Sequence, residues 1–301
     1  MPDQASVLRR LVRQTQRESV RQTAPRPRLL VLSGALPGAG ATTLAVNLAV
    51  ALAEQGGGVV LADADTVRPA VRRLCEAPGG GSLADVWSGR QELAGILQPG
   101  PAGVLVAGGQ RTSAAQEPYR KASHRRWLRQ LGSLGPRVAW VLVDTGSAAG
   151  AAVQPFWRAA DQVALVLTPE SAAILEAYAR IKQAGGARRP VFGLIVNRAA
   201  NRPAASRVHR CVSRSCRRFL GTRIAWWGYV REDPSVPAAE AAARPFAGSP
   251  PRGPAGRDVQ VLAGRIAERF AVRARPARTA NQDKKVKNSS GDQAVRGRYA
   301  W

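Results

Sequence analysis

The stretch LLVLSGALPGAGATTLAVNLA, residues 29–49, predicts a buried strand, a glycine loop and a helix in that order. An apolar run ends in small residues, and a run of Ala, Leu and Val without helix breakers begins at Thr42. Gly38 and Gly40 therefore come just before a helix N-terminus, where free backbone N–H groups and the positive end of the helix dipole favour an anion. A phosphate group is the natural ligand of such a loop. An ordinary turn made of small residues is the alternative.

The lysine of the usual phosphate-binding loop is missing. That loop reads G-x-x-x-x-G-K-[ST], in which the lysine contacts the terminal phosphates and the hydroxyl binds Mg²⁺. Here Ala41 stands at the lysine position, whereas Gly40 and Thr42 are retained. The backbone cradle and the magnesium-binding hydroxyl remain but the mobile positive charge is absent, so the pattern indicates a degenerate site.

The chain is strongly basic. Its 301 residues include 45 Lys and Arg against 20 Asp and Glu, which gives a net charge of +25. Such an excess favours contact with nucleic acid, an anionic membrane or an acidic partner, and a solvated basic surface is the alternative. Hydrophobic residues make up 45% of the chain, which is enough for the core of a large domain.

The sequence gives no sign of disulfides, a metal centre or a membrane span. Cys75, Cys211 and Cys216 do not form a disulfide framework, and the cluster of His209, Cys211 and Cys216 lacks a fourth zinc ligand. We find no apolar run of about 18 residues and no N-terminal leader. We therefore expect a cytoplasmic protein, which could still lie peripherally at a membrane.

Apolar runs alternate with helical patterns over most of the chain, which predicts a doubly wound, mostly parallel α/β sheet with helices on both faces. Further strands are expected at residues 59–62, 103–107, 138–143, 162–168, 191–196 and 224–230. Further helices are expected at residues 118–133, 171–183, 203–219, 235–243 and 256–272. We expect this domain to span residues 28–273 and a disordered basic tail to span residues 274–301.

The N-terminal segment, residues 1–27, combines a helix with a basic linker. Residues 3–13 predict a short amphipathic helix that begins after Asp3 and has arginines opposite an apolar stripe. A helix on a polar linker is often a docking peptide, and a frayed terminal helix is the alternative.

Acidic and amide side chains follow three of the predicted strands. Asp63 and Asp65 follow one strand, Asp144 a second and Asn197 a third. Because ligands of doubly wound sheets lie beyond the carboxyl ends of the strands, we expect these side chains to face the glycine loop. A carboxylate there can hold Mg²⁺ or orient a water molecule, and an amide can read the edge of an adenine. Solvated or hydrogen-bonded turns are the alternatives.

Several short motifs occur in register along residues 3–273. They are Asp3-Gln4-Ala5 with Leu8-Arg9; Gly38, Gly40 and Thr42 with Asn47-Leu48-Ala49; Asp63-Ala64-Asp65; Ser82-Leu83-Ala84-Asp85-Val86; Gly89-Arg90-Gln91-Glu92-Leu93; Val143-Asp144-Thr145; Ala177-Tyr178 with Ile181-Lys182; Asn197; and Gly228 to Asp233. Together they resemble the MinD/ParA family of P-loop ATPases, and within it the regulators of flagellar number called FlhG, FleN or YlxH.

The resemblance implies a site for ATP and Mg²⁺. By similarity, Thr42 and Asp144 would hold Mg²⁺, Asp144 also being the metal-side acid of catalysis, and Asp65 would orient the attacking water. The residues implied to bind the nucleotide are Gly38, Ala39, Gly40, Ala41, Thr42, Thr43, Asn197, Arg231 and Asp233. Asn197 and the backbone from Arg231 to Asp233 would contact the adenine.

The chain departs from the family pattern at its catalytic loop. The family loop reads K-G-G-x-G-K-[ST], and its first lysine reaches across an ATP-sandwiched dimer. Here the two lysine positions are Leu36 and Ala41, Pro37 replaces a glycine, and Ala148 stands where the second switch usually has glycine. A missing transition-state donor lowers the rate by roughly 10²–10³, so we expect normal turnover only if another cation substitutes. The candidate cations are Arg68, Arg72 and Arg73.

The resemblance also implies partners. The segment from Asp3 to Arg13 is similar to one that docks on a signal-recognition-type GTPase, FlhF, and ATP drives homodimers in the family. No amphipathic stripe follows Phe270, so contact with an anionic membrane or with DNA would be electrostatic and sensitive to salt. We expect a regulator of flagellar number or placement. The alternatives are a divergent active ATPase of the cell-division or chromosome-partitioning type and a non-enzymatic basic scaffold on DNA.

Overall fold

The computed structural model describes residues 26–111, 121–135, 137–185 and 190–274. The predicted helix at residues 3–13 and the chain beyond residue 274 lie outside this part.

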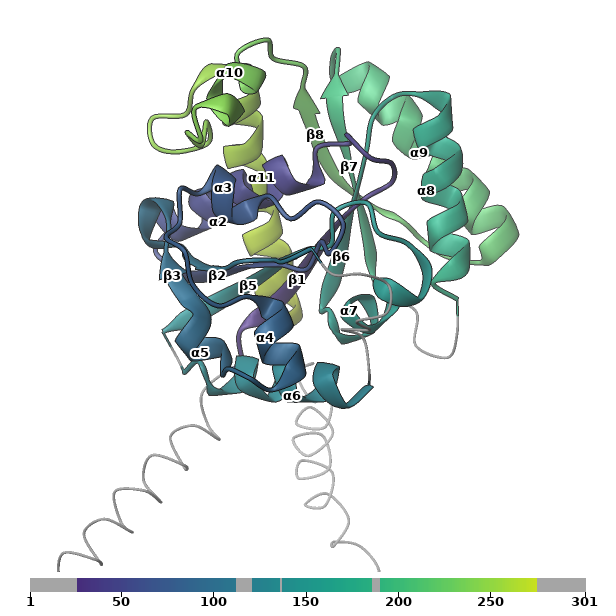
Figure 1. Cartoon of the computed structure of the whole chain (residues 1–301). Helices are drawn as coiled ribbons and strands as arrows, with labels where there is room; N and C mark the ends of the chain where they lie inside the picture. Colours follow the sequence, from purple (N-terminus) through teal and green to yellow (C-terminus); the bar gives the residue numbers. More distant parts are fainter. Residues whose placement is uncertain (1–25, 112–120, 136, 186–189, 275–301) are drawn as a thin grey trace, which may run out of the picture.

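Eight strands form one sheet in the order β3-β4-β2-β5-β1-β6-β7-β8 (Figure 1). All neighbouring pairs are parallel except the edge pair of β3 and β4. The strands are β1 Arg28–Gly34, β2 Gly58–Asp63, β3 Leu97–Pro99, β4 Leu105–Ala107, β5 Val138–Asp144, β6 Gln162–Leu167, β7 Phe192–Ala199 and β8 Ala225–Arg231. The predicted mostly parallel sheet is therefore confirmed.

Helices cover both faces of the sheet. They are α2 Ala41–Glu54, α3 Val71–Leu74, α4 Leu83–Ser88, α5 Leu93–Ile96, α6 Lys121–Ser133, α7 Gln154–Ala159, α8 Ser171–Gln183, α9 Arg202–Leu220, α10 Val236–Ala241 and α11 Gly253–Ala274, with 3₁₀ turns η1 Pro101–Gly103 and η2 Gly150–Ala152. In the part of the chain that the structure describes, no helix is long and apolar enough to cross a membrane.

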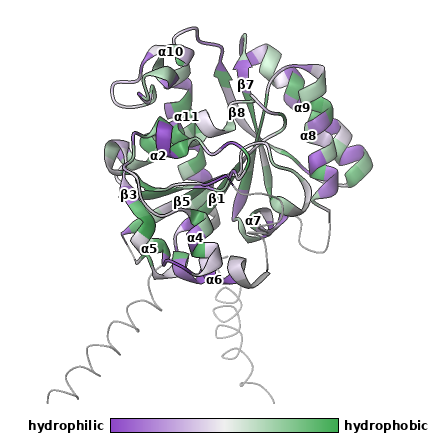
Figure 2. Ribbon diagram, in the orientation of Figure 1, coloured by the Kyte–Doolittle hydropathy of each residue, from purple (hydrophilic) through white to green (hydrophobic). Residues whose placement is uncertain are grey.

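The side chains of the central strand β1 alternate between two hydrophobic cores, one on each face of the sheet. Leu30 and Leu32 pack on one face of the sheet, against α2, α3 and α11, whereas Leu29 and Val31 pack on the other face, against α4 and α6 to α9. Both faces of a parallel sheet are buried, which explains why this strand is continuously apolar. Figure 2 shows hydrophobic residues along the strands and on the helix sides that meet them.

The edge beyond β2 differs from the prediction. Residues 103–107 were expected to form one strand, but Pro101–Gly103 make a 3₁₀ turn and the strand begins only at Leu105. Ala102 has a left-handed φ of 52°, and the Gly100 N–H donates to the Val104 carbonyl across this turn. The turn reverses the chain, so that β3 pairs antiparallel with β4, an edge strand that the apolar pattern did not reveal.

Strand β7 packs closely against β8 because Gly193 has no side chain. A Cβ placed on Gly193 would lie 1.8 Å from Cε2 of Trp227, which is buried on β8. The adjacent strands thus pack an indole into the space above a glycine.

We predict that Gly193→Ala lowers the free energy of unfolding by about 2–3 kcal/mol, because overpacking forces the buried indole or the strand to move. Gly264→Ala, on α11, is the matched control: its Cβ would meet nothing within 4 Å, and alanine favours a helix. Urea denaturation measures both variants. Equal stabilities of Gly193→Ala and the unsubstituted protein would contradict this packing.

Candidate functional site

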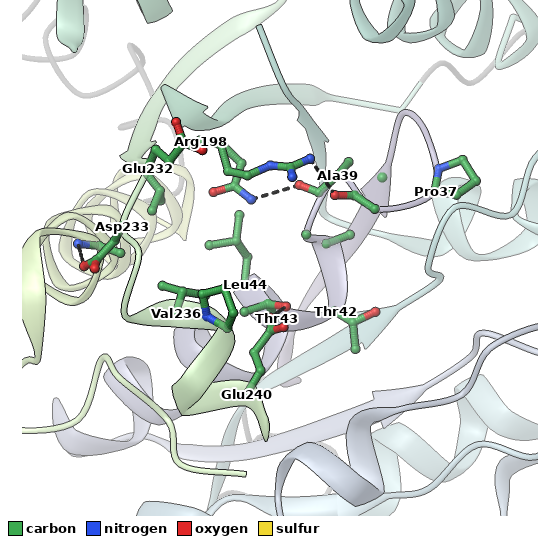
Figure 3. A pocket seen from close by; sticks show the side chains of 18 of the residues that line it. Pro37, Ala39, Thr42, Thr43, Leu44, Arg198, Glu232, Asp233, Val236 and Glu240 are labelled. Carbon is green, nitrogen blue, oxygen red and sulfur yellow. Dashed lines mark hydrogen bonds between the residues drawn. The ribbon is translucent and has the colours of Figure 1, made fainter. Parts of the chain in front are cut away.

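A cavity of about 630 Å³ opens at the carboxyl ends of the strands, between the loop after β1 and the loop after β8 (Figure 3). Its lining includes Gly38 through Thr43 on one side and Arg231 through Asp233 on the other, with Asp65, Arg68, Asn197 and Arg198 between them. All the residues that the sequence implied to bind nucleotide therefore line one cavity. Asp144 is fully buried and is not among the lining residues.

The glycine loop has the geometry of an anion cradle. Gly38 and Gly40 have φ values of 78° and 85°, which residues with a Cβ rarely adopt. The N–H groups of Ala41, Thr42 and Thr43 have no acceptor among the described residues, and the first turn of α2 carries no acidic side chain. These free donors belong to residues that line the cavity and lie at a helix N-terminus, where a phosphate can bind.

Hydrogen bonds from neighbouring segments hold this loop in place. The Gly34 N–H donates to the Gly146 carbonyl at 2.7 Å, and the Asn197 side-chain amide donates to the Ala39 carbonyl at 2.9 Å. A Cβ on Gly40 would lie 2.3 Å from Nδ2 of Asn197. The close approach of β7 to the loop therefore depends on glycine at this position.

Two buried carboxylates lie side by side beneath the loop, because Asp63 of β2 and Asp144 of β5 are register partners. Burial raises the pKa of Asp63 above its ordinary value, and the nearby Asp144 raises it further. The Asp63 oxygens accept the Asp65 and Val71 N–H groups at 3.1 and 3.0 Å, so this carboxylate holds the turn after β2.

Asp144 has an unused acceptor. Its Oδ1 accepts the Gly146 N–H at 2.9 Å, whereas its buried Oδ2 has no hydrogen-bond partner in the described structure. Burial raises the pKa of Asp144, and the Thr42 hydroxyl lowers it. An orphaned carboxylate oxygen facing a helix-terminal hydroxyl is a donor pair that suits a hard cation such as Mg²⁺.

Protein groups alone do not complete a metal centre. Within the described ranges, no three His, Cys, Asp or Glu side chains gather as metal ligands. Mg²⁺ is usually held by one or two protein groups together with phosphate oxygens and water. Thr42 and Asp144 therefore fit the ion as part of a nucleotide complex.

Asp65 borders the cavity from the turn after β2. Its Oδ1 accepts the N–H groups of Val67 and Arg68 at 2.8 and 2.9 Å, which fixes the carboxylate. A Cβ on Gly146 would lie 1.9 Å from its Oδ2, so the loop after β5 passes directly against it. Asp65 can therefore hold a water molecule at the phosphate end of the cavity.

Residues 231–233 form the opposite wall. The Arg231 guanidinium is paired with Asp258 at 2.8 Å, and Asp233 accepts the N–H groups of Ser235 and Ala255. Both side chains hold the wall, and the backbone N–H groups of Arg231 and Glu232 are engaged as well, with the Asp258 carboxylate and the Ala199 carbonyl.

The arginines near Asp65 point in different directions. Arg68 lines the cavity, whereas Arg72 donates to the carbonyls of Gly80 and Gly81 and, like Arg73, is not among the lining residues. The sequence hypothesis that Arg72 and Arg73 lean toward the phosphates is therefore wrong. The side-chain direction depends on α3, a helix that the sequence did not predict.

Three further contacts at the site were missed by sequence reasoning. Arg198 donates to the Gly38 carbonyl at 2.9 Å, and Thr43 donates to the Glu240 carboxylate of α10. Arg180 on α8 is only 4% exposed and donates to the Ser147 and Ala148 carbonyls at 2.8 and 2.7 Å. Arg180 therefore holds the loop at Ala148, the position at which the family pattern usually has glycine. The sequence signal for Arg198 was its place beside Asn197; nothing comparable pointed to Arg180 or Glu240.

The chain is similar to proteins of known family. Residues 34–246 match the family described as the CobQ/CobB/MinD/ParA nucleotide binding domain. The antiactivator FleN of Pseudomonas aeruginosa is 30% identical over 211 residues, which span 69% of this chain and 75% of FleN. The flagellum site-determining protein YlxH of Helicobacter pylori is 27% identical over 186 residues, which span 60% of this chain and 62% of YlxH.

A solved structure of a nucleotide complex has the same fold. The septum site-determining protein MinD from Pyrococcus horikoshii, complexed with Mg-ADP, superposes with a TM-score of 0.66 at 18% identity. The match covers 83% of this chain and 100% of that chain. At this identity the likeness shows the fold alone.

Proposed function

The chain belongs to the CobQ/CobB/MinD/ParA family of nucleotide-binding domains, and we propose that it is an ATP-binding regulator of the FlhG kind that controls flagellar number or placement. The observation that carries ATP binding is the cavity itself. Its volume of about 630 Å³ is within the usual range of ligand pockets. Free N–H donors lie on one side of it and residues 231–233 on the other, with Asn197 between them.

The side chains divide the chemistry between them. Thr42 and Asp144 would supply oxygens to the cation, the α2 N–H groups would bind phosphate, and Asp65 would orient the attacking water. Bound Mg²⁺ would neutralise phosphate charge and the buried carboxylates. Because Leu36 and Ala41 replace the two lysines, we infer that the protein binds ATP but hydrolyses it slowly.

The flagellar role rests on relatives and on the N-terminal segment. FleN is named an antiactivator and YlxH a flagellum site-determining protein, and the matches to them span 69% and 60% of this chain. Residues 3–13, outside the described part, keep the docking pattern seen in the sequence. We infer that this segment docks on a GTPase of the signal-recognition type, and that the nucleotide state of the domain controls a homodimer.

The surface of α9 favours a second candidate, a basic scaffold on DNA. Its exposed face carries six arginines and no acidic residue; these are Arg202, Arg207, Arg210, Arg214, Arg217 and Arg218. None of them forms an ion pair with another described residue. Binding to random duplex DNA that weakens steeply as salt rises would favour this candidate, and weak binding at low salt would remove it.

Restoring the lysine tests the proposed chemistry. We predict that Ala41→Lys raises the rate of ATP hydrolysis by roughly 10²-fold or more, because the new cation reaches the transferred phosphate. Phosphate release at saturating Mg-ATP is the measurement. Ala41→Lys with Asp65→Asn should lose this gain. Asparagine is the better control than alanine, since its oxygen can still accept the Val67 and Arg68 N–H groups. An unchanged rate in Ala41→Lys would contradict the assigned role of this loop.

Removing the N-terminal segment tests the partner. We predict that deletion of residues 3–13 abolishes binding to an FlhF-type GTPase while leaving ATP binding unchanged, because none of the residues implied to bind nucleotide belongs to this segment. A pull-down with the purified GTPase measures the first effect and calorimetry the second. Retained GTPase binding would show that the docking surface lies elsewhere.

A further inference from the structure

The end of β7 is irregular where it meets the glycine loop. Its register with β8 shifts between Val196 and Ala199, so that Asn197 and Arg198 form a bulge. Arg198 has a φ of 51°, in the left-handed region that a residue with a side chain adopts only where its surroundings hold it. Bulges of this kind often re-aim side chains beside functional sites.

The bulge turns two consecutive side chains onto the same loop. In a regular strand, neighbouring side chains point to opposite faces of the sheet. Here the Asn197 amide donates to the Ala39 carbonyl and the Arg198 guanidinium donates to the Gly38 carbonyl, both at 2.9 Å. Figure 3 shows Arg198 extending over the loop beside Ala39. The bulge in β7 therefore places the Arg198 side chain on the glycine loop.

The charges around the cavity leave this arginine available. Three arginines line it: Arg231 is engaged with Asp258, whereas Arg68 and Arg198 form no ion pair with any described residue. A guanidinium has five N–H donors, and Arg198 gives one hydrogen bond, to a neutral carbonyl. It can keep this bond and donate to phosphate oxygens as well.

The carboxylates that line the cavity favour a cationic side chain beside the phosphates. They belong to Asp65, Glu232, Asp233 and Glu240, and they outnumber the two unpaired arginines. A polyphosphate that enters the cavity adds further negative charge. Ala41, at the lysine position, supplies no positive charge to balance it. Both side chains are exposed, but Arg198 is already held on the loop, whereas Arg68 has no hydrogen bond to a described residue that would aim it there.

We propose that Arg198 is the cation that contacts the phosphates of the bound nucleotide, in place of the lysine missing at Ala41. This inference rests on the proposed ATP binding. Arg198 would act by direct contact, with the β7 bulge as the device that positions it.

Calorimetric titration of the full chain with Mg-ATP and, separately, with adenosine tests the contact. We expect Arg198→Gln to weaken ATP binding by about tenfold, as for loss of one charge-assisted hydrogen bond, and to leave adenosine binding unchanged. Arg198→Gly should weaken ATP binding equally, and because glycine accepts the left-handed φ, it keeps the backbone intact. Arg223→Gln removes the same charge from an exposed position outside the cavity and should change neither affinity.

The outcomes separate the two proposals. If the unsubstituted protein binds ATP and both Arg198 variants bind it equally well, the inference is overturned and the proposed function stands. Loss of ATP affinity in Arg68→Gln but not in Arg198→Gln also overturns it, and assigns the contact to Arg68. If the unsubstituted protein binds adenosine but no ATP, both proposals fail.

Discussion

The turn from β1 into α2 leaves the first N–H groups of a buried helix without acceptors among the described residues, and the rest of the site depends on these free donors. The turn is possible because Gly38 and Gly40 adopt left-handed φ values, and Asn197 can approach Gly40 because that residue has no Cβ. Free donors at a helix N-terminus form an anion site through backbone geometry alone. Replacing the lysine with Ala41 therefore removes a charge from the site without removing the site.

Because that charge is missing, the site depends more on the contacts made by the surrounding elements. Asp144 keeps an unpaired oxygen beside Thr42, which favours a cation, while acidic side chains line the cavity wall. Arg180 clamps the loop after β5 through two carbonyls, and Glu240 contacts Thr43 from α10. These contacts fix the loops around a nucleotide-binding site in which neither Leu36 nor Ala41 supplies the charge of a lysine.

The sequence revealed the fold and much of the site because both follow periodic or local rules. Apolar runs alternating with helical patterns predicted the parallel sheet, and the strand ends brought Asp65 and Asn197 to the cavity as expected. The rest depends on tertiary geometry. The aim of Arg198 follows from a bulge and that of Arg72 from a short helix, and the antiparallel β3 follows from a 3₁₀ turn at Pro101. Composition and residue spacing do not predict where these two side chains point or how β3 pairs.

The most direct measurement is a calorimetric titration of the full chain with Mg-ATP and competition by Mg-ADP. A nucleotide site built on backbone donors predicts saturable binding at one site per chain, displaced by ADP and lost in Gly40→Ala. In that variant the new Cβ would meet the Asn197 amide and strain the left-handed turn. No binding of either nucleotide at millimolar concentration would contradict the central claim that the loop still binds phosphate.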